Sequence, residues 1–221
     1  MHSPRKIVVI GAGIAGLCTA VYARKCGYDV ELLEMHDTAG GLATSWHRGG
    51  YVFETCLHWL MGSNPDRPFH QRWREVFDID RLEFVELQEF TRIETEHGES
   101  LSIYADVNRL EAELLRRAPE DTAEIRRLAA AVRRFMDFEI PGLWGGWEDW
   151  LSWLGTIPYL RLLGRFSRVT CEAYGRQFKN PLLRRFFGKG ELAQLSALAI
   201  VLSLAWLSRH DAAIRSAALR Q

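Results

Sequence analysis

Three glycines and one glutamate near the N-terminus have the types and the spacing that bind a dinucleotide. Gly11, Gly13 and Gly16 form a Gly-x-Gly-x-x-Gly motif, and Glu34 ends an apolar stretch further along the chain. Gly11 is expected to turn the chain tightly, Gly13 to let backbone approach a pyrophosphate, and Gly16 to let a helix lie close to a strand. The N-terminus of that helix offers unpaired N–H groups and a partial positive charge to phosphates. A carboxylate at position 34 can accept hydrogen bonds from ribose hydroxyls and would repel a 2′-phosphate, which disfavours NADP.

The residues around the motif have the pattern of a strand, a helix and a second strand. Residues 6–10 are apolar and β-branched, as expected of a buried parallel strand, and residues 30–33 form the second expected strand. The helix between them carries one apolar face, made by Ile14, Leu17, Cys18, Val21 and Tyr22. Glycine-rich turns are common, so a turn that binds no nucleotide is the alternative. The strand–helix–strand context favours the nucleotide.

A pair of glycines, Gly40 and Gly41, follows the expected ribose carboxylate. The stretch 34–46 resembles the flavoprotein superfamily that includes amine oxidases and carotenoid desaturases, in which such a pair lets the chain pass close to FAD. The stretch 50–63 resembles proteins related to phytoene desaturase and carotenoid isomerase, and a weaker likeness extends to roughly residue 208. The resemblance implies FAD as the cofactor. The residues expected to bind it are Gly11, Ala12, Gly13, Ile14, Ala15, Gly16, Glu34, Gly40, Gly41 and Leu42.

Three positions depart from the pattern of that family. Many relatives carry arginine after the glycine pair, where it can meet the pyrophosphate, and this chain has Leu42. Many have aspartate and glycine in the later motif, where this chain has Glu54 and Cys56. Glu54 would orient the ribityl or pyrophosphate region or bond to nearby backbone, and His58 would line the flavin site or satisfy a core hydrogen bond. An inert thiol is the favoured interpretation of Cys56 over a reactive one.

The order of elements predicts an α/β fold with two parts and a tail. The N-terminal part of a Rossmann-like FAD-binding domain would span 1–65, a partial α+β, mostly helical substrate domain 66–208, and a divergent tail 209–221. Strands are expected near 51–54 and at 82–87, 90–95 and 101–104. Helices are expected at 68–77, at 107–117 with Asp106 as its N-cap, from Pro119 and over most of 147–208. One β-α-β unit followed by a separate sheet and helices indicates an insertion. No later segment returns to complete the FAD sheet, so we also expect a truncated chain.

Composition indicates an ordinary globular protein. The 221 residues are 48% hydrophobic and 25% charged, and 28 basic side chains balance 28 acidic ones, which gives no reason to expect nucleic-acid binding. Four widely spaced cysteines form no zinc pattern, and no histidine pair has metal-ligand spacing, so no metal site is expected. We interpret the cysteines as reduced thiols of a cytoplasmic protein. A cluster of arginines is interpreted as a solvated helix face: Arg126, Arg127, Arg133 and Arg134.

Catalytic residues cannot be assigned from the sequence. Flavin dehydrogenation needs a substrate C–H bond held against the flavin in a dry pocket, so no catalytic triad is expected. Tryptophans that recur every third position would line an apolar substrate tunnel, lie at a membrane interface or pack in a core. They are Trp144, Trp147, Trp150 and Trp153. The apolar run 192–207 favours a buried helix over a membrane span, although an apolar substrate would suit peripheral contact with a membrane.

Three functions compete. The first is an FAD-dependent oxidoreductase acting on an apolar, carotenoid- or isoprenoid-like substrate. The second is a truncated, non-catalytic fragment, or a half-protein that needs a partner chain to complete the FAD site. The third, an NAD-dependent dehydrogenase, is disfavoured by the glycine pair at 40–41.

Overall fold

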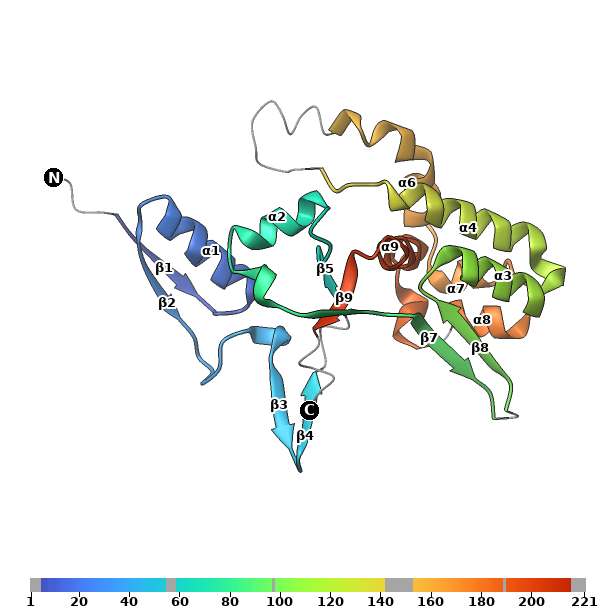
Figure 1. The fold of residues 1–221 in the computed structure, drawn as a ribbon, viewed down its shortest axis with the longest axis horizontal. Helices are drawn as coiled ribbons and strands as arrows, with labels where there is room; N and C mark the ends of the chain where they lie inside the picture. The colour runs from blue at the N-terminus through green and yellow to red at the C-terminus, as the bar shows by residue number, and fades with distance from the viewer. Residues whose placement is uncertain (1–4, 55–58, 97, 142–152, 189, 216–221) are drawn as a thin grey trace. The chain divides into compact units, whose positions relative to one another are not determined.

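The computed structural model describes residues 5–54, 59–96, 98–141, 153–188 and 190–215 (Figure 1). The chain divides into two compact units. The first unit comprises Met1–Val85 together with Ala213–Gln221, and the second comprises Glu86–Ala212.

The first unit begins with a strand, a helix and a parallel strand. β1 (Lys6–Ile10) pairs with β2 (Asp29–Leu33), and α1 (Ile14–Lys25) connects them. Gly27 has a φ of +85°, a conformation that glycine adopts readily, and its N–H donates to the Arg24 carbonyl at 3.0 Å where the helix ends. The element order predicted for residues 5–34 is therefore confirmed.

The rest of the first unit is built from short elements. β3 pairs with β4 in an antiparallel hairpin, and β5, β9 and β6 form a three-stranded sheet in that order. A single short strand was expected near 51–54, and β3 and β5 were not predicted. The elements are η1 (Gly41–Ala43), β3 (Ser45–Arg48), β4 (Tyr51–Glu54), β5 (Leu60–Met61), α2 (Pro68–Arg74), η2 (Ile79–Arg81), β6 (Phe84–Glu86) and β9 (Ala212–Arg215).

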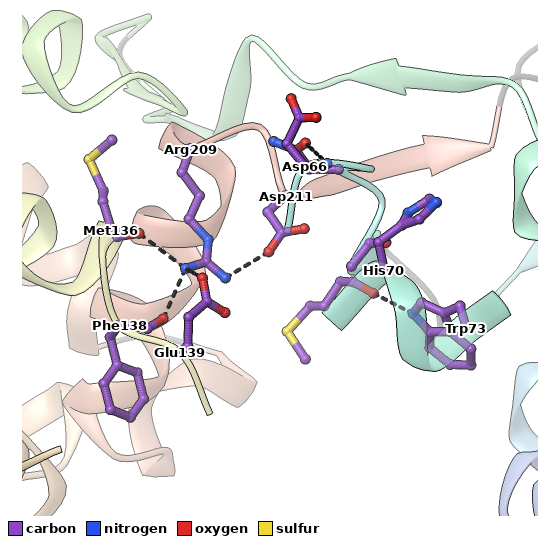
Figure 2. Close-up of polar contacts among 11 residues, drawn as sticks. Asp66, His70, Trp73, Met136, Phe138, Glu139, Arg209 and Asp211 are labelled. Carbon is purple, nitrogen blue, oxygen red and sulfur yellow. Dashed lines mark hydrogen bonds and ion pairs between the residues drawn. The ribbon is translucent and has the colours of Figure 1, made fainter. Parts of the chain in front are cut away.

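Two side chains of α2 hold the backbone that follows β5 (Figure 2). The buried His70 ring places Nδ1 2.8 Å from the Gly62 carbonyl oxygen, and the indole of Trp73 donates to the Met61 carbonyl at 2.7 Å. Gly62 has a φ of +82°, and a Cβ atom there would lie 2.6 Å from the Phe69 ring. The segment from residue 66 to Val85 belongs to the first unit. From the sequence, the substrate domain was predicted to begin at residue 66.

The second unit contains a hairpin and six helices among its described residues. β7 (Glu89–Glu94) pairs antiparallel with β8 (Ser100–Tyr104). As expected, Asp106 caps α3, and its side chain accepts from the N–H groups of Asn108 and Arg109. The helices are α3 (Val107–Arg117), α4 (Thr122–Met136), α6 (Leu160–Ser167), α7 (Cys171–Gly175), α8 (Pro181–Gly188) and α9 (Ala197–Ser208), with short 3-10 turns η3 (Pro119–Asp121), η4 (Ile157–Tyr159) and η5 (Glu191–Gln194).

A continuous apolar core fills the second unit. Aromatic rings form one end of it: Phe178 and Phe187 stack with ring centroids 5.4 Å apart, and Tyr174 meets Phe187 edge-on at 5.0 Å. The apolar run predicted to be a buried helix is α9, whose residues Val201, Leu204 and Ala205 are fully buried. Among the described residues, no helix is long and apolar enough to cross a membrane.

A buried ion pair closes the C-terminal end of α9 (Figure 2). Arg209 donates to the carbonyl oxygens of Met136 at 3.0 Å and Phe138 at 2.9 Å, and to the carboxylate of Asp211 at 2.7 Å. The side chains of Arg209 and Asp211 are only 3% and 2% exposed. Buried charges of this kind are tolerated when they are paired and hydrogen-bonded, so these contacts fix where α9 ends relative to α4.

The C-terminal segment contains a short strand. Within residues 209–221, which were predicted to be a divergent tail, residues 212–215 form β9, which lies between β5 and β6 in sheet order. This strand was missed because it is short and pairs with residues far away in the sequence. It does not join β1 and β2, which form a two-stranded sheet within the described residues.

Candidate dinucleotide-binding site

Two glycines of the turn at residues 11–16 are required by the fold itself. Gly11 has a φ of +96°, a backbone conformation that residues other than glycine rarely adopt. Its N–H donates to the Leu33 carbonyl at 2.7 Å. A Cβ atom on Gly16 would lie 1.9 Å from the Gly11 carbonyl oxygen and 3.5 Å from the Val9 side chain. The first turn of α1 therefore lies directly on the turn that leaves β1.

Gly13 differs from its two neighbours in the motif. Its backbone angles, φ −70° and ψ 173°, are open to any residue. A Cβ atom there would meet only the Cα atom of Gly41, at an ordinary contact distance of 3.9 Å. The fold would accept a side chain at this position, and glycine instead leaves the space before the helix open.

The N-terminus of α1 is free of side-chain caps. Gly13 occupies the N-cap position, no side chain caps the described helix, and its first turn contains no acidic residue. The intrahelical hydrogen bonds of α1 begin with the Leu17 N–H, which donates to the Gly13 carbonyl at 2.9 Å. The N–H groups before it have no intrahelical partner, which is the arrangement that attracts anions. Basic Arg24 and Lys25 occupy the last turn, where they suit the helix dipole.

The second glycine pair lies against the first motif. The Gly40 N–H donates to the Ala12 carbonyl at 2.7 Å, and a Cβ atom on Gly41 would lie 3.1 Å from the Gly13 Cα atom. Gly40 and Gly41 both have positive φ, at +127° and +59°. Two motifs that are separate in the sequence thus form one continuous glycine surface. Leu42, the next residue, is 85% exposed.

Glu34 points back to the same turn. Its carboxylate accepts from the Ala12 N–H at 2.5 Å and from the His36 N–H at 2.9 Å. These backbone hydrogen bonds, first that from His36 and then that from Ala12, lower the pKa of Glu34 below its usual 4.5. The carboxylate is therefore ionised at neutral pH, and an exposed carboxylate has further lone pairs with which to accept hydroxyl groups.

Thr44 is a part of the site that the sequence analysis did not single out. Its hydroxyl donates to the Gly41 carbonyl at 2.8 Å, and its methyl group lies 2.8 Å from the point where a Gly40 Cβ atom would stand. Threonine three residues after a turn glycine is a recognisable signal for such a hydroxyl-to-carbonyl bond. Thr44 therefore holds the glycine pair in its conformation.

Several other candidates lie outside the described residues. These include Cys56, His58, Trp144, Trp147 and Trp150, together with the side chain of Glu54. Trp153 is described and is 48% exposed. Among the described cysteines, Cys18, Cys26 and Cys171 are free thiols, and burial raises the pKa of Cys171 to about 11. No group of three potential metal ligands occurs in the part of the chain that the structure describes.

Comparisons with known proteins cover the part of the chain that contains this site. The family described as the NAD(P)-binding Rossmann-like domain matches residues 9–78, which include both glycine motifs and Glu34. The chain is 32% identical over 127 residues to a lycopene-forming phytoene desaturase of Pseudescherichia vulneris, covering 57% of this chain and 25% of that protein. It is 27% identical over 202 residues to a lycopene-forming phytoene desaturase of Paracoccus sp., covering 84% of this chain and 37% of that protein.

A solved structure extends the likeness in fold. Wild-type putrescine oxidase bound to putrescine aligns with 96% of this chain and 45% of its own, with 20% sequence identity and a TM-score of 0.51. At that identity the match shows the fold alone. The chain thus spans less than half the length of these relatives and of the solved structure that it matches.

Proposed function

The chain is related to the phytoene desaturases, which are FAD-dependent oxidoreductases, and from this premise we propose that it binds FAD for oxidoreduction of an apolar substrate. The open N-terminus of α1, with Gly13 before it, would hold the pyrophosphate. The carboxylate of Glu34 would accept hydrogen bonds from the adenosine ribose. Gly40 and Gly41 would form the adjoining wall of the site. Bound FAD would supply the acceptor for a hydride from a substrate C–H bond.

One observation carries the proposal: the fold needs glycine at positions 11 and 16 but not at position 13. A side chain on Gly13 would stand where a phosphate must approach the helix N-terminus, and it would disturb little else. The space that a Cβ atom on residue 13 would fill suits a diphosphate. The uncapped N-terminus of α1 behind that space suits one as well. The ionised Glu34 disfavours a 2′-phosphate next to the same turn.

The substrate class follows from the names of the relatives. Those proteins act on phytoene, so an apolar polyene or a related isoprenoid is the substrate we propose for this chain. A protein that takes an apolar substrate would be suited to a cytoplasmic location with peripheral contact to a membrane.

The test is a titration of the purified full chain with FAD, NAD and NADP, followed by quenching of flavin or tryptophan fluorescence. We expect binding of FAD, with weaker binding of NAD and none of NADP. Gly13→Ala should weaken FAD binding at least tenfold, because losing a charge-assisted backbone hydrogen bond costs about 1.5–3 kcal/mol. Gly164→Ala serves as the matched control, since a Cβ atom there meets nothing within 4 Å. A colourless chain that takes up no FAD, or equal affinity of the two variants, would refute the proposal.

A second candidate function rests on the uncovered face of β1 and β2. Val8, Ile10 and Leu33 are 50%, 86% and 47% exposed, and the strand register places Ile10 beside Leu33. Apolar side chains on a sheet face are normally covered. We propose as the alternative that the flavin site is complete only when further polypeptide covers this face. That alternative predicts that the isolated chain binds FAD but that an apolar polyene does not bleach the bound flavin under anaerobic conditions. If the polyene bleaches the flavin bound to the isolated chain, the alternative is excluded.

A further inference from the structure

The helix α1 carries the candidate diphosphate site, but packing does little to fix its direction. No residue of α1 is buried, and its apolar side chains Ile14 and Tyr22 are 43% and 40% exposed. At its N-terminus the helix lies against the glycine turn through the close approach of Gly16 to Gly11. Because burial holds α1 so weakly, any polar contact at its other end has a large share in fixing the helix axis.

Such a contact is made at Glu75, the residue that ends α2. The Tyr22 hydroxyl donates to Oε2 of Glu75 at 2.5 Å, and the ammonium group of Lys25 donates to the backbone carbonyl of Glu75. Arg72, one turn earlier in α2, pairs with Oε1 of Glu75 at 3.3 Å. We call these four residues the Glu75 clamp. Two of the three acceptor oxygens of Glu75 are therefore used by side chains of α1.

Hydrogen bonding sets the charges within the Glu75 clamp. The hydroxyl of Tyr22 lowers the pKa of Glu75 below its usual 4.5, and the carboxylate in turn raises the pKa of Tyr22 above its usual 10.0. At neutral pH the carboxyl group is therefore ionised and the phenol is protonated, as this hydrogen bond requires. A hydrogen bond to a charged acceptor is stronger than one between neutral groups, so the clamp can offset part of the weak packing of α1.

The α2 end of the clamp is anchored within the first unit. His70 and Trp73 of α2 bond to backbone carbonyls at and after β5 (Figure 2). Arg74, the residue before Glu75, donates to both carboxylate oxygens of Asp80, at 2.8 and 2.9 Å. These contacts fix the last turn of α2, so Glu75 is held where it can support α1.

We propose that Glu75 is a positioning residue for the dinucleotide site, which holds the direction of α1 through Tyr22 and Lys25 and thereby aims the helix N-terminus at the diphosphate. The N–H groups of a helix point along its axis, so a change in tilt would turn those of the first turn away from the phosphate oxygens. This inference rests on the proposed binding of FAD, and it adds a residue that lies outside both glycine motifs.

The experiment measures FAD binding to the full chain by flavin fluorescence, and hydrogen exchange of the α1 amides without any ligand. Glu75→Ala should weaken FAD binding about threefold, as expected for loss of an exposed charged contact, and should speed exchange in residues 18–25 of α1. Tyr22→Phe removes the same hydrogen bond from the other side and should give similar losses. The double variant should lose little more than either single variant, because both remove one interaction.

Two readouts separate positioning from a general loss of stability. Glu75→Gln keeps an amide oxygen that can accept from Tyr22, so it should restore most of the affinity lost in Glu75→Ala. Affinity for ADP should fall together with that for FAD. Affinity for adenosine, which has no diphosphate, should stay unchanged in NMR titrations. Equal losses for ADP and adenosine would show that Glu75 only stabilises the fold, and would overturn the proposal.

Matched controls come from the same unit. Tyr28→Phe removes the hydroxyl of a tyrosine that is 37% exposed, and Asp78→Ala removes a carboxylate that pairs with Arg81 at 2.8 Å. Both should bind FAD and exchange hydrogen like the unmodified chain. If Glu75→Ala leaves exchange in α1 unchanged, or speeds exchange without weakening FAD binding, the proposal is wrong. An unmodified chain that binds neither FAD nor ADP would instead refute the proposed flavin function, and this inference with it.

Discussion

The two units reach their folds by different means. In the second unit, the helices pack around a core of buried aromatic and aliphatic side chains. In the first unit, by contrast, no residue of α1 is buried. Among the described residues of the first unit, the buried apolar side chains are small or isolated ones, such as Val9, Ala12 and Ile79. The glycine turn at residues 11–16 is thus specified by backbone geometry and hydrogen bonds. Packing, which dominates the second unit, contributes little there.

This difference indicates which kind of substitution should destabilise each unit. A core that excludes water loses stability in proportion to the apolar volume removed from it. A turn held by close backbone contacts loses its conformation when one methyl group is added. Substitutions that delete atoms should therefore damage the second unit most, and those that add atoms should damage the first.

The largest expected effect is in the aromatic core of the second unit. Phe187→Ala removes a ring that is 1% exposed and contacts Phe178, Tyr174 and Phe186. We expect a loss of about 3–5 kcal/mol in the free energy of unfolding, measured by urea denaturation. Phe53→Ala in the first unit removes a ring that is 42% exposed and should cost far less. Similar costs for the two variants would remove the contrast between the units.

The next effect is in the glycine turn. Gly16→Ala places a methyl group 1.9 Å from the Gly11 carbonyl oxygen, so backbone must move. We expect a cost of about 1–3 kcal/mol, as for other overpacked sites, with loss of FAD binding. Gly13→Ala is the control, because its fold should be intact while its FAD binding is weakened. If hydrogen exchange of the β1 amides is unchanged in Gly16→Ala, the close contact does not constrain the turn.

A smaller effect is expected from acid. Because backbone hydrogen bonds lower the pKa of Glu34 below 4.5, its contribution to stability is complete above pH 4.5 and is lost as the pH falls through the lowered value. Glu34→Gln should flatten the acid dependence of β1 and β2 protection in hydrogen exchange. Glu31→Gln, on the same strand, should keep the response of the unmodified chain. An unchanged acid response in Glu34→Gln would show that the carboxylate does not stabilise the turn.

The smallest effect is a gain. Leu42 is 85% exposed, and an arginine at this position would bring a positive charge beside the glycine surface. We expect Leu42→Arg to raise affinity for FAD by no more than about fivefold, because exposed ion pairs contribute about 0.2–1 kcal/mol. The gain should disappear at high salt, and Leu42→Gln should show none. A loss of affinity in Leu42→Arg would mean that the side chain points away from the phosphates.

The sequence predicted what depends on nearby residues. The strand–turn–helix around Gly11, the Asp106 cap and the bounds of α3 are all determined within a few positions along the chain. β5 and β9 could not be predicted, because a two-residue strand and a C-terminal strand become ordered only through pairing with distant partners. The hydrogen bond between Gly40 and Ala12 likewise could not be predicted, although the glycines at these motifs suggested that the two segments approach closely.

Two features were not predicted, for a physical reason of another kind. The apolar face predicted for α1 carries Ile14 and Tyr22, and these side chains are 43% and 40% exposed. Periodicity predicts which side of a helix is apolar, and it does not predict how much neighbouring structure covers that side. The buried Arg209 also escaped notice, since a lone arginine after a helix normally ends in solvent.

The ion pair between Arg209 and Asp211 has a consequence for synthesis on the ribosome. Its guanidinium bonds to carbonyl groups more than seventy positions earlier in the chain. Until the last codons of this unit are translated and the segment clears the exit tunnel, those carbonyls have no such donor. The helical unit should therefore acquire protease resistance abruptly and late, and a nonsense mutation upstream of codon 209 should yield a nascent chain that is degraded rapidly.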